Sequence, residues 1–252
     1  MTIKNIFQYS RPRFRLYVIG PFLLGFATSV MNPSEFLSLS FIGRIVYFSL
    51  PANLLIYGIN DIADYETDKI NPKKQSYELL LTPERQKIMR SLIAITNIPF
   101  LIRAALQWQY IVITLLVFRF FGIFKSTKPI RAKAIPFLDG IFNILYIIPW
   151  FLGYFLGWWT HINRFIVWAG TLRCMAMHAY SAIPDIQADK QAKLQTTATI
   201  LGKHWTLLYC SICRTIAGII GYTIIWPISL LAMIVYIILI IISRRKELFT
   251  IY

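Results

Sequence analysis

Long apolar runs alternate with short polar segments along the whole chain. A helix of about 20 apolar residues spans the hydrocarbon core of a bilayer, and eight runs approach that length. They cover residues 14–31, 41–59, 88–106, 109–124, 136–157, 164–183, 204–225 and 227–243. The pattern predicts an all-α fold, a polytopic transmembrane helical bundle that forms a single membrane-embedded domain, residues 1–252.

The second run and the polar residues after it have features of their own. Pro51 lies inside the run and predicts a bend, which a membrane helix tolerates when neighbouring groups satisfy the freed carbonyl. The polar stretch that follows, Lys69–Lys87, is long enough to cap the membrane surface. Further along, Trp158 and Trp159 predict an aromatic belt at a membrane interface.

The composition supports a membrane protein. The chain is 57% hydrophobic with a mean hydropathy of +0.57, and 15% of its residues are charged, against roughly 25% in soluble domains. Because the basic residues lie in loops between apolar runs, the net charge of +15 does not indicate a nucleic-acid partner. In the eight-span arrangement, 21 of the 26 lysines and arginines fall on one side of the membrane. This excess predicts that this side faces the cytoplasm. Both termini are then cytoplasmic, and no cleavable signal peptide is expected.

The segment NDIADYETD, residues 60–68, is acidic in a chain that has only 11 aspartates and glutamates. In a helix, residues four positions apart lie about one turn apart on the same face, which places Asn60, Asp64 and Asp68 in one row. Carboxylates stacked in this way repel one another unless a cation lies among them. The spacing and glycine of an EF-hand calcium loop are absent. A solvated acidic loop remains the alternative interpretation.

A second acidic pair, Asp185 and Asp189, follows Pro184 on the same predicted side. The loop KSTKPIRAK, residues 125–133, lies between the two motifs in sequence and is strongly basic. Carboxylates and phosphate oxygens are typical ligands of Mg²⁺, and lysine and arginine bind phosphate directly. The combination predicts a metal-diphosphate site facing an apolar cavity. Prenyl diphosphates suit such a site because they join a charged head to an apolar tail.

Other kinds of site are less well supported. The three cysteines, Cys174, Cys210 and Cys213, lie in apolar runs and complete no zinc set. A Gly-rich phosphate loop is absent from the sequence. Charges within a membrane also mark ion paths, so a transporter or a non-catalytic cation-binding membrane protein is the alternative from a different class.

The two acidic motifs resemble the signatures of the UbiA-type intramembrane prenyltransferase superfamily. NDIADYETD is similar to the pattern NDxxDxxxD, and DIQAD, residues 185–189, is similar to DxxxD. The resemblance covers essentially the whole chain, with the motifs in the same order and on the same membrane side. It implies a bundle around a central cavity that opens to a cytoplasmic-side cap. The family usually has nine spans, against the eight counted above.

Within the superfamily, the segments around both motifs most resemble the lycopene elongase group, which adds five-carbon units to the ends of a carotenoid. The segments are PANLLIYGINDIADYETDKINPKK and HAYSAIPDIQADKQAKLQTTATILG. The implied reaction is Mg²⁺-dependent transfer of a prenyl group from dimethylallyl diphosphate to lycopene. The alternative enzyme is an aromatic prenyltransferase of quinone, chlorophyll or haem biosynthesis.

The resemblance also implies roles for individual residues. The metal ligands would be the oxygen-bearing side chains of both motifs: Asn60, Asp61, Asp64, Asp68, Asp185 and Asp189. Asn60, Asp64 and Asp68 would hold one Mg²⁺ with support from Asp61, and Asp185 and Asp189 would hold a second. Four of these carboxylates are the predicted catalytic residues: Asp64, Asp68, Asp185 and Asp189. The predicted substrate-binding residues are Asn60, Tyr57, Lys128, Arg131, Lys133 and Tyr180.

Some positions depart from the family's pattern. Quinone-type members carry YxxxK before the second motif, where this chain has Met177 and Ser181. The family's Tyr-Ser in the basic loop is Lys125-Ser126 here. Diphosphate binding near the second motif must therefore be arranged differently. Of the residues before that motif, Tyr180 is equally suited to a cavity wall or an interface, and His178 is more typical of a helix cap.

Overall fold

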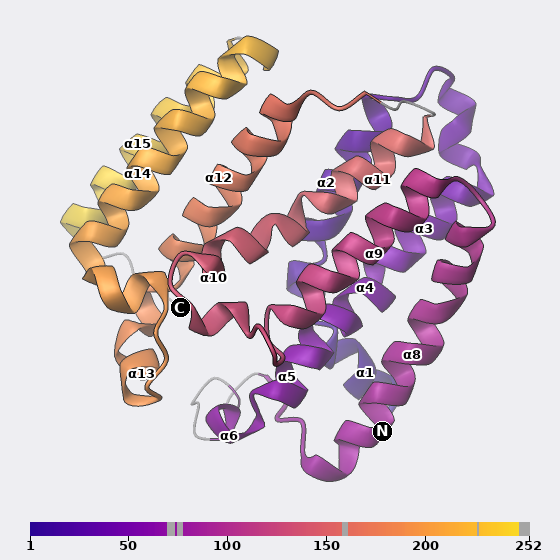
Figure 1. The fold of residues 1–252 in the computed structure, drawn as a ribbon, viewed down its shortest axis with the longest axis horizontal. Coiled ribbons are helices and arrows are strands. Elements are labelled where there is room, and N and C mark those ends of the chain that lie inside the picture. Colours follow the sequence, from indigo (N-terminus) through magenta and orange to yellow (C-terminus); the bar gives the residue numbers. More distant parts are fainter. Residues whose placement is uncertain (70–73, 75–77, 158–160, 226, 247–252) are drawn as a thin grey trace. The chain divides into compact units, whose positions relative to one another are not determined.

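The computed structural model describes residues 1–69, 74, 78–157, 161–225 and 227–246. These residues form helices, with no strand in the described part of the chain, as Figure 1 shows. They group into two compact units, Met1–Ile130 with Leu145–Thr160 and Arg131–Ile144 with His161–Tyr252. The predicted all-α class is confirmed, and the single domain stays a prediction.

The first unit begins with a short helix and continues through a series of helices, most of them apolar. They are α1 Ile3–Tyr9, α2 Leu16–Ala27, α3 Leu39–Ser49, α4 Pro51–Asn53, the π-helical turn η3 Leu54–Gly58, α5 Ile59–Ala63, α6 Tyr65–Asp68, α8 Pro83–Ala105, α9 Gln109–Phe124 and α11 Ile148–Leu156. Their starts follow local sequence signals. The Ser38 hydroxyl accepts a hydrogen bond from the Phe41 amide at the start of α3 (3.2 Å). Pro83 occupies the first turn of α8, where no amide hydrogen is needed.

The bend predicted at Pro51 is confirmed. The helical path breaks at Leu50 (φ −136°, ψ −60°), and Pro51 starts α4. Two side-chain amides satisfy carbonyls around the break: Asn53 Nδ2 donates to the Phe48 carbonyl (2.6 Å) and Asn97 Nδ2 to the Pro51 carbonyl (3.0 Å). The broken helix is therefore tolerable in an apolar setting, and it leads through η3 directly into the first acidic motif.

Helices α2 and α11 pack closely through glycines. A Cβ on Gly153 would meet the backbone nitrogen of Phe26 at 2.6 Å, and a Cβ on Gly25 would overlap the Trp150 backbone. Small residues of this kind let membrane helices approach each other at the backbone. Helix α11 therefore has a fixed position on α2.

We expect Gly153→Val to destabilise the protein by about 1–3 kcal/mol or more, because the added atoms must push two backbones apart. Thermal unfolding of the purified protein in detergent measures the effect. Gly20→Val on α2 is the matched control, since a Cβ there meets nothing within 4 Å. Equal melting temperatures for the two variants would contradict the close approach.

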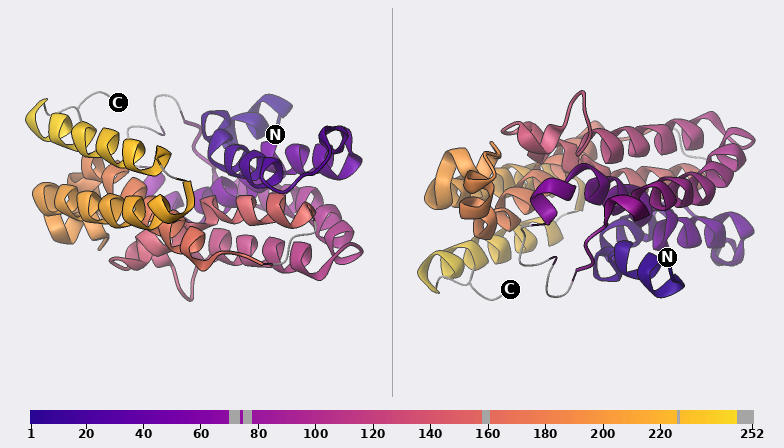
Figure 2. Two further views of the ribbon diagram at one scale, coloured as in Figure 1. Left: turned by 90° about the horizontal axis from the view of Figure 1, so that it is seen from above. Right: turned by 90° about the horizontal axis from the view of Figure 1, so that it is seen from below.

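The second unit contains the remaining helices. They are η4 Ala132–Ala134, α10 Leu138–Ile141, α12 Arg164–Ser181, η6 Ile183–Asp185, α13 Ile186–Gln191, α14 Thr197–Ile225 and α15 Ile228–Lys246. Helix α14 packs on α12 and on α15, and Figure 2 shows α15 running beside α14. A core of small and apolar residues joins them, including Ala176, Leu207, Cys210 and Ile240.

The start of α14 differs from the prediction. It begins at Thr197 rather than 204 and kinks at Gly202, whose φ of +69° lies in the left-handed region. Glycine adopts this conformation without the steric cost that a side chain imposes.

The predicted apolar runs all lie on helical segments, and the integral membrane character is confirmed. Three described segments are long and apolar enough to cross a membrane: Leu39–Ala63, Pro83–Ala105 and Leu138–Leu156. Gln109–Phe124 and Ile228–Ser243 are shorter apolar helices. The number of spans stays a prediction. The predicted polar cap is shorter than expected because α8 begins at Pro83.

Two further predictions fall partly or wholly outside the described residues. They are the cap at residues 70–73 and 75–77, and the aromatic belt at Trp158 and Trp159.

Candidate functional site

The first acidic motif begins on α5 and ends on α6. The helix is interrupted between them at Asp64 (φ −104°, ψ 9°), so the predicted helical register holds only in part. The one-turn spacing survives in the backbone, where the Asp64 amide donates to the Asn60 carbonyl (2.9 Å) and the Asp68 amide to the Asp64 carbonyl (2.8 Å). The side chains of Asp64 and Asp68 are both buried. Two carboxylates are thus withdrawn from solvent within one short segment.

Asp61 is bound by two cationic side chains. Its Oδ1 accepts hydrogen bonds from Arg11 Nη2 (2.7 Å) and Lys74 Nζ (2.8 Å). The side chains of Asp61 and Lys74 are only 2% and 4% exposed. Removal of a charge from water is costly unless an opposite charge is close, and this arrangement meets that condition. The geometry favours an ion-pair role for Asp61 over the predicted support of a metal.

Arg11 ties the N-terminal segment to the motif. Its backbone is left-handed (φ 47°), and its guanidinium lies over the Tyr57 ring, 4.9 Å from the centroid. Glu78 Oε2 lies 3.4 Å from Arg11 Nη2. Burial lowers the pKa of Arg11, but the charges of Asp61 and Glu78 outweigh burial, and the net direction of the pKa shift is upward. Arg11 is therefore a permanent positive charge beside the acidic motif.

Lys74 bridges the carboxylates of this region. Besides Asp61, its Nζ lies 3.2 Å from Asp68 Oδ2 and 3.7 Å from Glu78 Oε2. Burial raises the pKa of Asp68 to about 6, while Lys74 opposes the rise and the nearby charges of Asp61 and Asp64 add to it. A raised carboxyl pKa means that the surroundings stabilise the ionised form of the carboxyl group less well than water does. An added cation would favour the ionised form of Asp68.

The start of the basic loop contacts the first motif. Ser126 Oγ donates to Asn60 Oδ1 (2.9 Å), and Lys125 Nζ lies 5.5 Å from the centroid of the Tyr146 ring. These are the two positions where the family pattern has Tyr-Ser. Tyr57 is buried, with its hydroxyl 3.5 Å from that of Tyr146. Tyr146 therefore stands near both Tyr57 and the basic loop.

The second motif lies in the other unit. Pro184 occupies the first turn of η6, and Asp185 lies at the junction with α13, which contains Asp189. Both carboxylate residues are half-buried. Of the predicted diphosphate ligands, Arg131 and Lys133 are half-buried around η4 in this unit.

The remaining predicted residues have varied surroundings. Lys128 belongs to the first unit and is exposed. The Tyr180 hydroxyl lies 2.6 Å from Ser243 Oγ, and its ring packs beside the core of the second unit. These contacts favour a packing role for Tyr180 within the second unit. His178 Nε2 lies 3.8 Å from Asp139 Oδ2.

Asp139 is a residue that sequence reasoning did not select. It is fully buried, and its carboxylate accepts hydrogen bonds from the Thr197 hydroxyl, the Thr197 amide (2.8 Å) and the Gly140 amide (2.7 Å). It thereby fixes the start of α14 beside α10. The only indication of this role in the sequence was the position of Asp139 near the start of an apolar run.

Arg11, Lys74 and Ser126 were also missed as members of the site. The sequence shows Arg11 and Lys74 only as two of many basic residues, which served to predict orientation. Their role depends on contacts with Asp61, from which Arg11 is separated by 50 residues in the sequence and Lys74 by 13. A single sequence carries no signal for such contacts.

The donor atoms of the first motif suit Mg²⁺, although no three His, Cys, Asp or Glu side chains of the described chain converge as a preformed metal site. Asn60 offers an amide oxygen, and Asp64 and Asp68 offer carboxylates. These are the hard oxygen ligands that Mg²⁺ prefers, and the ion usually keeps several waters and takes substrate phosphates as further ligands. The residues present therefore fit a magnesium ion that binds together with a diphosphate.

Comparison with other proteins agrees with the motifs. A sequence model of the UbiA prenyltransferase family matches residues 18–248. A lycopene elongase/hydratase of Haloarcula japonica is 36% identical over 215 residues, covering 85% of this chain and 73% of that protein. A lycopene elongase/hydratase of Halobacterium salinarum is 36% identical over 213 residues, covering 82% and 75%.

Solved structures share the fold. A UbiA homolog from Archaeoglobus fulgidus bound to DMAPP and Mg²⁺ has a TM-score of 0.80 at 19% identity, covering 96% of this chain and 88% of that chain. The apo UbiA homolog from Aeropyrum pernix K1 has a TM-score of 0.69 at 17% identity, covering 99% and 93%. Because the family match spans nearly the whole chain and the relatives exceed 30% identity, this protein belongs to the UbiA prenyltransferase family of membrane enzymes.

Proposed function

We propose that this chain transfers dimethylallyl groups from dimethylallyl diphosphate to lycopene in C50-type carotenoid biosynthesis, with Mg²⁺ as cofactor. Lycopene is proposed as the acceptor because this chain is 36% identical, over 85% of its length, to a protein named lycopene elongase/hydratase. The donor and the cofactor are supported by structural relatives solved with GPP or DMAPP and Mg²⁺.

In this proposal Asn60, Asp64 and Asp68 of the first motif would hold one Mg²⁺, and Asp185 and Asp189 would hold a second. When bound, Mg²⁺ neutralises the charge that develops on the diphosphate as its bond to the prenyl group breaks. The Ser126 hydroxyl donates to the Asn60 amide oxygen and thereby fixes the orientation of the Asn60 side chain. Ion pairs with Arg11 and Lys74 hold the backbone of the motif in place through Asp61.

Positive side chains bind the diphosphate. Arg131 and Lys133 are the main candidates, and Lys128 is a further one. Arg131 has a left-handed backbone (φ 46°), an uncommon conformation for a residue other than glycine. Guanidinium and ammonium groups form charge-assisted hydrogen bonds to phosphate oxygens.

The chemistry is an electrophilic alkylation of an alkene. The allylic C–O bond of the donor breaks, and the diphosphate leaves with the electron pair. A terminal double bond of lycopene then attacks the allylic carbon, forming the new C–C bond. The resulting carbocation loses a proton or adds water and then loses a proton.

We further propose that both motifs and both termini face the cytoplasm, on the basis of the distribution of lysine and arginine. Donor and Mg²⁺ are then supplied from the same compartment, while the acceptor arrives from the bilayer.

The test supplies the purified protein in liposomes with dimethylallyl diphosphate, Mg²⁺, lycopene and a mixture of aromatic acceptors. Mass spectrometry is expected to find lycopene heavier by one or two five-carbon units, with release of diphosphate that depends on Mg²⁺. Mass gain by an aromatic acceptor alone would overturn the lycopene assignment. Cation binding without diphosphate release would indicate a non-catalytic membrane protein or transporter instead.

A further inference from the structure

A buried carboxylate and a partly exposed imidazole, Asp139 and His178, lie side by side in the second unit, apart from the two acidic motifs. Asp139 lies in the first turn of α10 and is fully buried. His178 lies near the end of α12, and its Nε2 is 3.8 Å from Asp139 Oδ2. The His178 side chain is 22% exposed, so part of the imidazole remains accessible.

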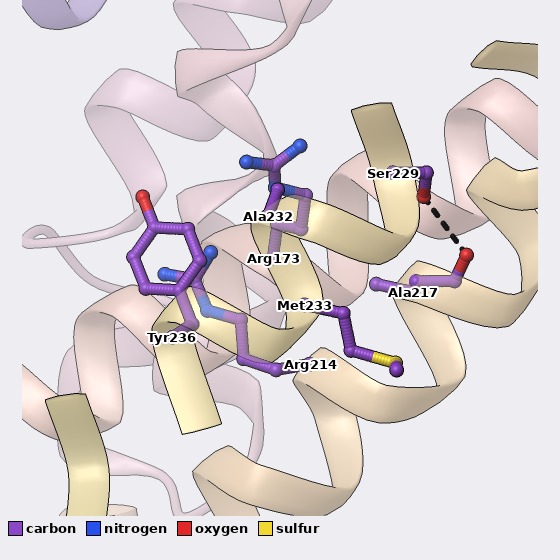
Figure 3. Close-up of a pocket in the computed structure, with 8 residues that line it drawn as sticks. Arg173, Arg214, Ala217, Ser229, Ala232, Met233 and Tyr236 are labelled. Carbon is purple, nitrogen blue, oxygen red and sulfur yellow. Dashed lines mark hydrogen bonds between the residues drawn. The ribbon is translucent and has the colours of Figure 1, made fainter. Parts of the chain in front are cut away.

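Among the described residues, His178 is the one basic side chain within 4.0 Å of the Asp139 carboxylate. The hydrogen bonds to that carboxylate come from neutral donors, two backbone amides and a threonine hydroxyl. The preceding basic residue on α12, Arg173, lies instead in the small pocket between α12, α14 and α15 that Figure 3 shows, with its Cζ 6.0 Å from the centroid of the Tyr236 ring. A buried carboxylate without a cation favours a positive charge on the group beside it, which here is the imidazole.

The pair is arranged for proton uptake and not for a hydrogen bond. Its separation of 3.8 Å is longer than a hydrogen bond, and the Asp139 carboxylate already has three donors. Uptake of a proton by His178 turns a neutral side chain beside an anion into an ion pair. Histidine gains and loses protons near neutral pH more readily than other side chains, which makes it a frequent general base in enzymes.

The position of His178 relates it to the second motif. It precedes Asp185 by seven residues, which is about two helical turns, or about 10 Å along the helix, on the same side. Hydrogen bonds from the Ala182 amide to the His178 carbonyl (3.0 Å) and from the Asp185 amide to the Ala182 carbonyl (3.1 Å) continue the coil between them. His178 lies within the apolar run 164–183, and Asp185 lies just beyond its end.

The proposed reaction needs a proton acceptor in such a position. Formation of the C–C bond leaves a carbocation on the acceptor, beyond the diphosphate head of the donor. A C–H bond beside the cationic carbon then breaks, its electron pair forms a double bond, and the proton passes to a base. Where water adds first, the proton leaves from the oxygen of that water. The base must therefore lie away from the carboxylates proposed to bind the diphosphate, among apolar surroundings.

We propose that His178 is the base that accepts this proton, with Asp139 as a positioning residue that stabilises the imidazolium. This inference rests on the proposed function. The unprotonated nitrogen of the neutral imidazole takes the proton, and the accessible part of the ring returns it to water before the next turnover. The competing interpretation is a pair that only holds α10 on α12.

The experiment compares full-length wild type with His178→Gln in liposomes that contain lycopene and aromatic acceptors, supplied with dimethylallyl diphosphate and Mg²⁺. Glutamine is polar but does not accept a proton at neutral pH. Transfer is expected to fall about a hundredfold or more, the scale of general base catalysis, while Mg²⁺-dependent binding of the donor stays close to that of wild type. His204→Gln, which alters an exposed histidine on α14, is the matched control and is expected to transfer at the wild-type rate.

Two further variants separate a base from a packing residue. In His178→Ala, added imidazole is expected to restore part of the transfer, because the free molecule replaces the missing ring. Asp64→Ala is not expected to respond to imidazole. Asp139→Asn is expected to slow transfer, and the double variant His178→Gln/Asp139→Asn to be no slower than His178→Gln alone, because residues that act as a unit are not additive.

Transfer by His178→Gln at the wild-type rate would overturn the proposal, since another group, such as the departing diphosphate, would then take the proton. Equal loss in His178→Ala with and without imidazole, or failure of both His178 variants to fold, would also overturn it and leave the pair a packing role. Prenylation of an aromatic ring ends in proton loss too, so the comparison holds for whichever acceptor wild type uses. Wild type that transfers to no acceptor would overturn the proposed function together with this inference.

Discussion

Asp64→Ala is expected to lower prenyl transfer at least about a hundredfold, the scale on which loss of one group that stabilises developing charge slows an enzyme. Asp64 is buried at the interruption between α5 and α6, and its carboxylate is a proposed Mg²⁺ ligand. Release of diphosphate from dimethylallyl diphosphate, measured in liposomes at saturating Mg²⁺, checks the result. Asp185→Ala in the second motif is expected to have an effect of the same order.

Glu66→Gln is the matched control for this prediction. Glu66 lies in the same nine-residue segment, but its side chain is 75% exposed and pairs with Lys69, and it is not a predicted ligand. Turnover close to that of wild type is expected. Full activity of Asp64→Ala, with the protein inserted in the membrane at its normal level, would remove the metal-site interpretation. Equal losses in Asp64→Ala and Glu66→Gln would indicate a general effect of charge in this segment.

The helices were predictable because their causes are local. An apolar run of suitable length forms a membrane helix almost regardless of its neighbours, and Pro51 marks the break in the second run. The early start of α14 was not predictable from hydropathy. It depends on Gly202 in the left-handed region and on hydrogen bonds from Thr197 to Asp139, which is far away in sequence.

The acidic residues of the site were also visible in the sequence, but their different roles were not. Asp61 and Asp64 are chemically identical and three residues apart. The structure distinguishes them because Arg11 and Lys74 bind Asp61. Those partners come from segments whose approach depends on tertiary packing, which neither spacing nor composition reveals. The family resemblance supplied the motif and not these contacts.

Asp61→Ala is expected to destabilise the protein by about 3–5 kcal/mol, the cost of leaving buried charges without their partner. Arg11 and Lys74 share Asp61 Oδ1 at 2.7 Å and 2.8 Å. The nearest remaining carboxylates are Asp68, 3.2 Å from Lys74, and Glu78, 3.4 Å from Arg11, and both contacts are longer than those to Asp61. Denaturant unfolding of the purified protein in mixed micelles measures the change, with prenyl transfer assayed on the same preparation.

Glu66→Ala is the control here as well, because the pair that it removes lies on the surface, where ion pairs contribute little. Its unfolding is expected to match that of wild type. The two interpretations of Asp61 then predict different results. An ion-pair partner predicts lost stability, with turnover that recovers where the protein remains folded. A metal ligand predicts wild-type stability and no turnover, and that result would return Asp61 to the proposed Mg²⁺ site alongside Asn60, Asp64 and Asp68.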